Sequence, residues 1–219
     1  MNRIIQALLK LATIVAAIAF IAGCATIYTS PDFSIYESGH ESIAILPFDV
    51  TINPGHKSKD VTQDELRELA TKQGETFQRA LYSQFLQGQQ RGKYTVTFQD
   101  IDETNVLLNR ELERHATRRV LSALTKSEIC EILKVDAVVS GDMALSKPMG
   151  TGAAIASALL LGIGGATNEG HINMSIHEGD GGKLLWNYEH KVKGNLLSSP
   201  ESVAKDLMKG VARTFPYKR

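Results

Sequence analysis

The side chains with the clearest chemical potential in this sequence are its two cysteines, Cys24 and Cys130, since a thiol can be acylated, oxidised or bound to a metal. Cys24 follows a stretch from Leu11 to Gly23 that contains no charged residue, and Arg3 and Lys10 make the preceding residues basic. A basic start, an apolar stretch of about 7–15 residues and small residues before a cleavage point are the parts of a secretory signal. The apolar stretch is shorter than the roughly 20 residues that a membrane-spanning helix needs.

The segment Ile21-Ala22-Gly23-Cys24 closes this stretch and resembles the bacterial lipobox. The resemblance implies that the Cys24 sulfur takes a diacylglyceryl group, that cleavage follows Gly23, and that the new amino group is acylated as well. The alternative is an ordinary signal peptide with a chance cysteine at its end. Small residues at both 22 and 23 favour the lipobox, so we predict a signal peptide over residues 1–23 and a mature protein that begins at lipidated Cys24.

A lipid on Cys24 would determine where the protein works. Each buried methylene contributes about 0.8 kcal/mol, and two or more acyl chains anchor a protein stably where one does so only marginally. The next residue is Ala25. In bacterial lipoproteins that resemble this one, Asp at that place means retention in the inner membrane, so Ala25 favours the outer membrane. We expect the folded part to face the periplasm.

The composition is that of an ordinary globular domain. Of 24 basic and 24 acidic residues, two basic ones lie in the predicted signal, which leaves a mature charge of 22 − 24 = −2. This balance gives no basic surface for nucleic acid. The mature length is 219 − 23 = 196 residues, which suits one domain. With Cys24 acylated, Cys130 has no partner for a disulfide, and its neighbours Ile129 and Leu133 indicate a buried small hydrophobe.

The order of predicted elements indicates an α/β fold, with a single domain over residues 41–217 and a mixed sheet. Apolar runs predict strands, and the pairs Thr62/Glu65 and Thr125/Glu128 are capping boxes that predict helix starts. The first expected elements are a strand over 42–49, a helix from 62, a half-buried strand over 94–98 and a charged helix from about 102 to 122. They are followed by a short helix from 125 to near 134, a strand over 137–139, a hairpin over 171–188 and a helix that begins at Ser199-Pro200.

The hairpin register can be argued from residue types. Two alternating runs, 171–176 and 184–188, flank the turn sequence Gly179-Asp180-Gly181-Gly182. A two-residue loop would place Trp186 opposite Ser175, whereas a three-residue loop would place it opposite Ile176. A slip by one residue turns a whole strand over, so pairing apolar with apolar side chains favours the three-residue loop.

Two segments lie outside this pattern. Residues 24–40 comprise the lipidated Cys24 and a predicted tether, residues 25–40, which mixes turn-forming residues with a few aromatic ones and reaches at most about 55 Å. Docking of its aromatic residues against the domain or a neighbouring copy is an open alternative. Residues 148–168 are uncharged and rich in Ala and Gly. Three interpretations of this insertion stay open: a helix of the core, a surface that packs against other copies, or a membrane contact too short to span alone.

Catalytic and ligand-binding patterns are missing from the sequence. It has no Cys-x-x-Cys or His-Glu-x-x-His spacing for zinc and no P-loop, and the glycines near 150–165 do not fit the dinucleotide fingerprint. His171 and His190 would face each other only in the disfavoured hairpin register, which argues against a metal pair. We therefore expect no catalytic residue, no cofactor and no metal, and we expect that the protein is not an enzyme.

Three motifs resemble a broad group of bacterial envelope proteins: the opening strand 43–48, the helix-to-strand turn 133–141 and the terminal hairpin 172–186. The group includes the curli secretion channel lipoprotein, the Pel polysaccharide export lipoprotein, the lipoprotein activators of penicillin-binding proteins and the amino-terminal domain of TolB. The resemblance implies a periplasmic α/β domain that binds proteins or forms rings. The insertion 148–168 departs from the activator-type members.

These inferences together predict an outer-membrane-anchored periplasmic lipoprotein. Its expected role is non-catalytic: it scaffolds, or assists the assembly of, an envelope secretion or export machine. The expected partners are the membrane, through Cys24, and other envelope proteins, and a homo-oligomer is an open alternative. The competing function is that of a lipoprotein activator of a peptidoglycan synthase, against which a tether of 16 residues (25–40) weighs because it is short for crossing the periplasm.

Overall fold

The computed structural model describes residues 25–53, 62–114, 121–146, 169–193 and 200–219. The predicted signal peptide, Cys24 and the whole insertion 148–168 lie outside the described residues. The strands are β1 (Ala25–Thr29), β2 (Ser42–Ile45), β3 (Asp49–Asn53), β4 (Thr97–Phe98), β5 (Ala137–Ser146), β6 (Glu169–Glu178) and β7 (Leu184–Lys193). The helices are α2 (Phe33–Glu37), α3 (Gln63–Gln90), α4 (Ile101–Arg114), α5 (Lys126–Leu133) and α7 (Pro200–Thr214), with a 3₁₀ turn at Leu121–Ala123.

All seven strands join one mixed sheet, which confirms the predicted α/β single-domain class. The order is β1-β7-β6-β5-β2-β4, and β3 pairs with β5 beyond the end of β2. The pairs of β5 with β2 and β3, and of β2 with β4, are parallel. The pairs among β5, β6, β7 and β1 are antiparallel. A parallel half made by crossovers is thus extended by an antiparallel hairpin and the N-terminal strand.

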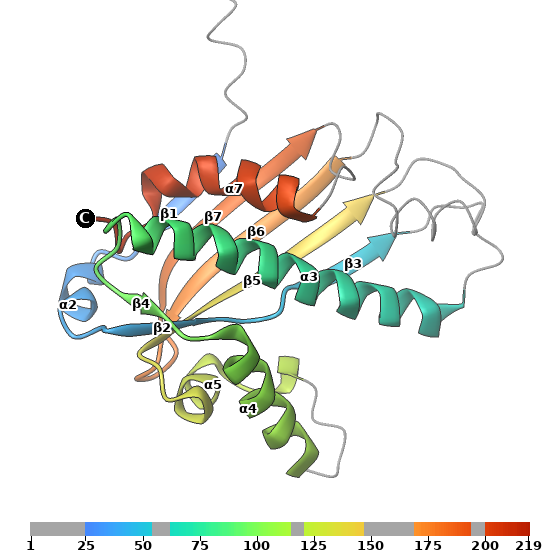
Figure 1. Ribbon diagram of the computed structural model, residues 1–219, viewed down its shortest axis with the longest axis horizontal. Helices are drawn as coiled ribbons and strands as arrows, with labels where there is room; N and C mark the ends of the chain where they lie inside the picture. The colour runs from blue at the N-terminus through green and yellow to red at the C-terminus, as the bar shows by residue number, and fades with distance from the viewer. Residues whose placement is uncertain (1–24, 54–61, 115–120, 147–168, 194–199) are drawn as a thin grey trace, which may run out of the picture.

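The main core lies between the sheet and helices α3 and α7, which run side by side across one face (Figure 1). We call this the helix face. Alternation places every second residue of a strand on it. The buried side chains that fill it come from α3 (Phe77, Leu81, Phe85), α7 (Leu207, Val211) and the strands (Ile43, Ile45, Val139, Ile172, Met174, Ile176, Trp186, Tyr188).

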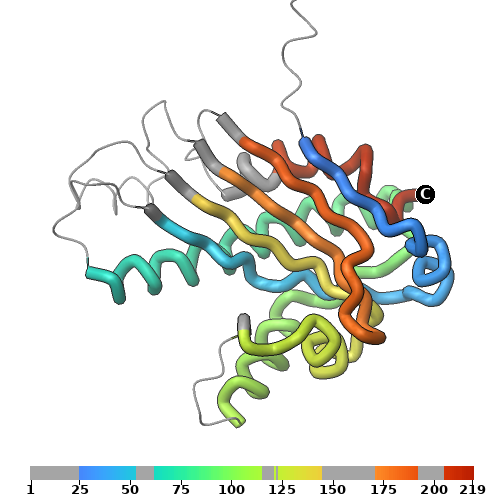
Figure 2. Tube along the Cα trace, turned by 180° about the vertical axis from the view of Figure 1, so that it is seen from behind, coloured from blue at the N-terminus to red at the C-terminus, as the bar shows by residue number. Residues whose placement is uncertain are grey.

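A smaller core lies on the opposite face, where α4 and α5 pack only on the lower part of the sheet (Figure 2). Its members from the sheet, Ala44 and Val138, are the strand neighbours of residues that face α3. The other buried members are Leu46, Leu108 of α4, Ile129, Cys130 and Leu133 of α5, and Val135. Above α4 and α5 no described helix crosses β5, β6 and β7, and we call this part of the sheet the open face.

Both predicted capping boxes are present. The Glu65 N–H donates to the Thr62 hydroxyl over 3.2 Å, and the Thr62 N–H donates to the Glu65 carboxylate over 2.8 Å. The hydrogen bonds between Thr125 and Glu128 repeat this pattern at 3.2 and 2.7 Å. These reciprocal bonds satisfy backbone donors that the first turn of a helix otherwise leaves free.

The predicted hairpin register is confirmed, since Ile176 lies opposite Trp186 and Met174 opposite Tyr188. Near the turn the ladder shifts between Ile176 and His177, so that His177 pairs with Leu184 and Leu185 is the extra residue. Leu185 is fully buried in the main core. The bulge therefore lets two neighbouring residues, Leu185 and Trp186, both contribute to that core.

Three predicted elements differ in length. The strand expected over 42–49 ends at Ile45 as β2, since Pro47 has no N–H for the ladder, and a further strand, β3, begins at Asp49. The strand expected over 94–98 keeps only Thr97–Phe98 in the sheet, while Tyr94 forms a separate bridge with Lys218. Helix α4 ends at Arg114, and residues 115–120 lie outside the described residues.

The tether predicted over residues 24–40 is wrong for its described part. Residues 25–29 are the edge strand β1, and residues 33–37 are the short helix α2. Phe33 is buried in the main core, and Ala25 and Tyr36 pack against that core. The β-branched and aromatic residues of this segment find a partner in β7, so the domain begins at residue 25 and not at 41.

Candidate functional site

The candidate site is the end of the sheet at which β1 begins. Ala25, the residue after the predicted lipidation site, lies opposite His190, and the pairing with β7 continues without a gap to Thr29 opposite Trp186. The Ser30 N–H then donates to the Leu185 carbonyl over 2.8 Å. The chain that follows Cys24 is therefore held by the sheet from its first residue.

Several other chain segments reach the same end of the sheet. Asn53 ends β3 opposite Ser146, which ends β5. Glu169 begins β6 opposite Lys193, which ends β7. Figures 1 and 2 show the corresponding ends of β3, β5, β6 and β7 along one end of the sheet, together with the start of β1. The segments 54–61, 147–168 and 194–199, whose structure is not described, are attached there.

Two contacts near the far end of β1 fix its direction. Asp32 and Lys183 form an ion pair between the N-terminal segment and the β6–β7 turn, and the Lys183 ammonium lies 5.5 Å from the centre of the Tyr36 ring. The hydrogen bond to Asp32 raises the pKa of Lys183. These groups are exposed to solvent, so the pair orients the segment more than it stabilises it.

The C-terminal residues hold the N-terminal segment from the core side. The Phe33 and Tyr217 rings pack edge to face with centroids 5.0 Å apart, and Nδ1 of His40 lies 2.6 Å from the Tyr217 hydroxyl. Burial raises the pKa of Tyr217 and lowers the pKa of His40, so the neutral forms of both groups are favoured. In these forms the Tyr217 O–H donates to the imidazole nitrogen.

The open face carries a connected row of polar side chains. The Asn173 amide donates to Asp142 over 3.0 Å, and the Asn187 amide donates to the oxygens of Asn173 and Ser175 over 2.5 and 3.1 Å. Nε2 of His171 lies 2.7 Å from a Glu189 carboxylate oxygen on the same face. These side chains form hydrogen bonds across β5, β6 and β7, so the surface of the open face there is polar.

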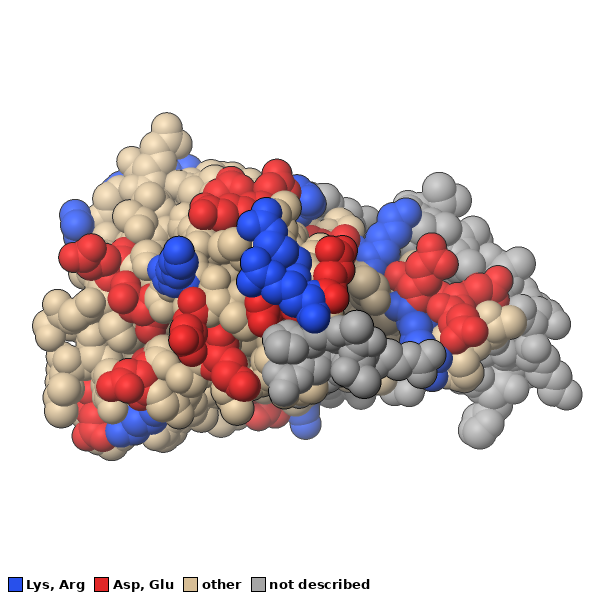
Figure 3. Space-filling model, turned by 90° about the horizontal axis from the view of Figure 1, so that it is seen from below, with Lys and Arg blue, Asp and Glu red and all other residues tan. Residues whose placement is uncertain are grey.

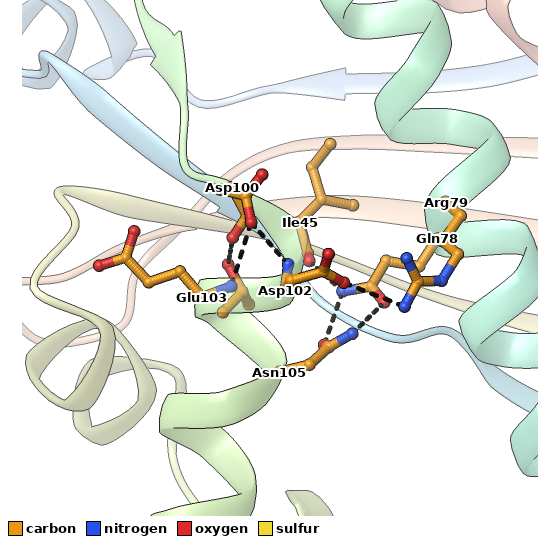
Figure 4. Close-up of polar contacts among 8 residues, drawn as sticks. Ile45, Gln78, Arg79, Asp100, Asp102, Glu103 and Asn105 are labelled. Atoms are coloured by element: carbon orange, nitrogen blue, oxygen red, sulfur yellow. Dashed lines mark hydrogen bonds and ion pairs between the residues drawn. The ribbon is translucent and has the colours of Figure 1, made fainter.

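A second polar network joins α3 to α4 (Figure 4). The fully buried Gln78 donates a hydrogen bond to the Ile45 carbonyl over 2.7 Å. Its side-chain amide also donates to the Asn105 amide oxygen over 3.0 Å and accepts from the Asn105 amide nitrogen over 3.1 Å. The Asp100 carboxylate caps α4 by accepting the N–H groups of Asp102 and Glu103 over 2.9 and 3.2 Å. These hydrogen bonds position α4 against α3 and the sheet.

The remaining predicted candidates have structural roles. Cys130 is buried in the smaller core, and burial, with help from the charges of Glu178 and Asp136, raises its pKa to about 12. Its thiol therefore stays protonated and unreactive. His171 and His190 lie on opposite faces, since His171 pairs with Lys191 and His190 with Ile172, as the favoured register predicted.

Charged side chains and possible metal ligands of the described residues are spread over the molecule. Figure 3 shows basic and acidic side chains intermixed on the underside of the molecule, with no basic patch in that view. Among the described residues no cluster of three or more His, Cys, Asp or Glu side chains could hold a metal ion, and no helix there is long and apolar enough to cross a membrane.

The functional feature that the sequence did not predict is β1 itself. Its residues Ala25-Thr26-Ile27-Tyr28-Thr29 are rich in β-branched and aromatic types, which is a strand signal. The signal was masked by its brevity and by the turn-forming Ser30-Pro31 that follows.

The structure defines a single α/β domain with one mixed sheet. No family model matches the sequence, and no curated protein matches it. Among solved structures it is similar to the PelC dodecamer from Paraburkholderia phytofirmans, with 12% identity, a TM-score of 0.39, and 86% of this chain and 94% of that chain covered. It is also similar to the lipoprotein GNA1162 from Neisseria meningitidis, with 13% identity, a TM-score of 0.38, and 80% and 97% covered.

A third similar structure is the C-terminal domain of LpoB from Salmonella enterica, with 9% identity, a TM-score of 0.32, and 70% of this chain and 83% of that chain covered. PelC and LpoB belong to the envelope lipoprotein group that the sequence motifs resemble.

Proposed function

We propose that this protein is an outer-membrane lipoprotein that holds its domain directly against the periplasmic face of the bilayer. There it acts without catalysis as a scaffold or assembly factor for an envelope secretion or export machine. The observation that carries the proposal is that β1 starts at Ala25 and pairs with β7 from its first residue. If Cys24 carries the lipid, no flexible segment separates the anchor from the folded domain.

The absence of a tether sets how far the domain reaches. A ten-residue strand such as β6 spans about 33 Å, so the turn at Asp180 would stand only that far above the anchored end of the sheet. An activator of a peptidoglycan synthase must reach across the periplasm to an enzyme at the inner membrane. The paired β1 thus removes even the short reach that residues 25–40 would supply as a tether, and it supports a partner at the outer membrane.

The first test concerns the anchor. Cells that express the wild type or Cys24→Ser are labelled with an alkyne fatty acid, and we expect label on the wild type only. Equal labelling of both proteins would overturn the anchoring part of the proposal.

The second test concerns the position of the domain. Lys191→Cys near the anchored end and Asp180→Cys at the opposite turn are exposed sites for a fluorophore. With the lipidated protein in vesicles that contain a quencher lipid, we expect strong quenching at residue 191 and weak quenching at residue 180. Equal quenching at both sites would mean that the domain is not held by β1.

The third test concerns the partners. In-cell crosslinking followed by mass spectrometry should recover outer-membrane components of a secretion or export apparatus. Recovery of cell-wall synthases as the main partners would favour the activator function. A variant with a flexible Gly/Ser linker of about 20 residues between Cys24 and Ala25 sharpens this result. It should lose the outer-membrane partners while its fold is unchanged.

A further inference from the structure

Among the described residues, the edge of the sheet at β1 carries none of the charges, prolines or bulges that protect many natural edge strands. Edge strands avoid aggregation by carrying Lys or Pro, by bulging or by being covered. The five residues of β1 are uncharged and contain no proline, and the pairing with β7 has no bulge. Among the described residues β1 has only one neighbour in the sheet, and Figure 2 shows it as the outermost strand.

Exposed apolar side chains gather at this edge. Ile27 is 44% exposed and Tyr28 is 46% exposed, although each is a large hydrophobic residue within a strand. Ile27 lies opposite Tyr188, so its side chain is on the helix face, while the side chain of Tyr28 is on the opposite side of the sheet. Apolar surface is thus available on both sides of the free edge.

The hydrogen-bonding groups of the edge can be assigned from the ladder. Ser30 donates to Leu185, so the antiparallel alternation places Tyr28 and Thr26 in the hydrogen-bonded pairs with β7. The N–H and C=O groups of Ala25, Ile27 and Thr29 then point away from β7. These are the groups that an added strand would pair with.

Strand β3, at the other edge of the sheet, is a possible partner for β1. Strand β3 also has five residues and, among those described, pairs only with β5. It runs parallel to β5, whereas β1 runs antiparallel to β7 and hence opposite to β3. If β3 of a second copy lay beside β1, the pairing would be antiparallel, and Ile27 would share a face with Val50 and Ile52.

We propose that the free edge of β1 binds a second copy of this chain, which adds its β3 antiparallel to β1 and continues the sheet from copy to copy. Each edge meets a different edge, so the contact is heterologous and repeats around a ring if the rotation closes. Because Val50 and Ile52 face the same side as α3, the α3 helix of the second copy would cover Ile27.

The choice of β3 as the partner strand rests on the proposed anchoring. In the β1–β3 arrangement every copy keeps the same direction, so all anchors lie at one end of the joined sheet and reach one bilayer. A symmetric antiparallel pair of two β1 strands would place the two anchors about 17 Å apart at opposite ends and invert one domain. Such a pair does not fit two anchors that start directly at Ala25.

The test uses the full lipidated chain in its membrane and exposed positions on one side of the two edges. Thr26 and Thr51 are both exposed, and both point away from the helix face. With a short bis-maleimide crosslinker, the double variant Thr26→Cys/Thr51→Cys should give a ladder of dimers and larger species. Either single variant should stay monomeric on the gel. Dimers from Thr26→Cys alone would overturn the proposal in favour of a symmetric pair, and the absence of a ladder from the double variant would overturn it outright.

A second measurement keeps the proposal testable if the double variant folds poorly. Ile27→Lys places a charge on the free edge, and Ile35→Lys makes the same change on the exposed side of α2. In light scattering of the detergent-solubilised protein, we expect Ile27→Lys to shift the mass to that of a monomer and Ile35→Lys to leave it unchanged. Equal masses for both variants and the wild type would overturn the proposal.

The same crosslinking in a Cys24→Ser background separates this inference from the proposed function. A ladder that persists without the lipid shows that the edges pair whatever the fate of the anchor. Lipidation of Cys24 without any ladder leaves the proposed function intact and removes this contact alone.

Discussion

The two faces of the sheet show how the same strands serve different purposes. On the helix face Ile172, Met174 and Ile176 of β6 are fully buried under α3 and α7. On the open face the intervening residues His171, Asn173 and Ser175 are only partly buried, and they bond polar side chains of β5 and β7. Stability is therefore concentrated on one side, while the other side stays in contact with water.

The first way to test this contrast is to change adjacent residues of β7 that point to opposite faces. Trp186→Ala removes a fully buried ring from the helix face, and we expect it to lower the free energy of unfolding by about 3–5 kcal/mol. Asn187→Ala on the open face should cost less than about 1.5 kcal/mol. Urea unfolding of both variants checks the prediction, and similar losses would contradict the division between the faces.

The second prediction tests how closely α3 approaches the sheet. A Cβ atom at Gly74 would lie 2.0 Å from the Phe48 carbonyl oxygen, which is backbone and cannot turn aside. Gly74→Ala should therefore destabilise the protein by about 1–3 kcal/mol, although Ala is the better helix former. Gly39→Ala is the matched control, because its Cβ would meet nothing closer than 3.8 Å. A stabilised Gly74→Ala variant, measured by thermal unfolding, would show that α3 is not tightly seated.

The third prediction concerns pH and the contact between the N- and C-terminal segments. Burial lowers the pKa of His40, so the folded protein binds fewer protons than the unfolded chain below the ordinary histidine value of about 6.5. This contribution to stability is present above that value and is lost as the pH falls through the lowered pKa. Burial lowers the pKa of His177 as well and adds in the same direction.

The measurement compares unfolding at pH 7.5 and pH 5.5. We expect His40→Gln to lose less stability than the wild type over this range, with the remaining loss partly due to His177. An unchanged pH dependence in His40→Gln would mean that the imidazole is not held in its neutral form by Tyr217 and its surroundings.

The smallest effect is expected on the open face. Asp142 is exposed, and its Oδ1 accepts a hydrogen bond from Asn173. Asp142→Asn keeps that acceptor and removes the charge, so stability should stay within about 0.5 kcal/mol of the wild type. A loss of several times that size in chemical denaturation would indicate that the open face carries more of the stability than its burial suggests.

Local signals in the sequence were sufficient for much of this fold. The capping boxes at Thr62 and Thr125 and the register of Ile176 with Trp186 depend on residues close together in the chain, and they were predicted correctly. The role of β1 was not predicted, because its partner β7 is remote in sequence and five residues give too weak a pattern. The bulge at Leu185 was not predicted either, although it places two neighbouring residues, Leu185 and Trp186, in the core. Lipidation of Cys24 stays a prediction, since that residue lies outside the described part of the chain.

The pairing of β1 with β7 also bears on the order in which the protein folds. Ala25 lies opposite His190, 190 − 25 = 165 residues further along the chain, so the first strand to leave the ribosome must wait for one of the last. Contacts so distant in sequence slow folding, because the chain loses the entropy of closing a long loop before the contact contributes any stabilising free energy. Until the β6–β7 hairpin exists, the uncharged segment Ala25–Thr29 has no strand to pair with. The folding chain therefore passes through a stage in which this strand is bare, and a chaperone that covers the segment would shorten that exposure.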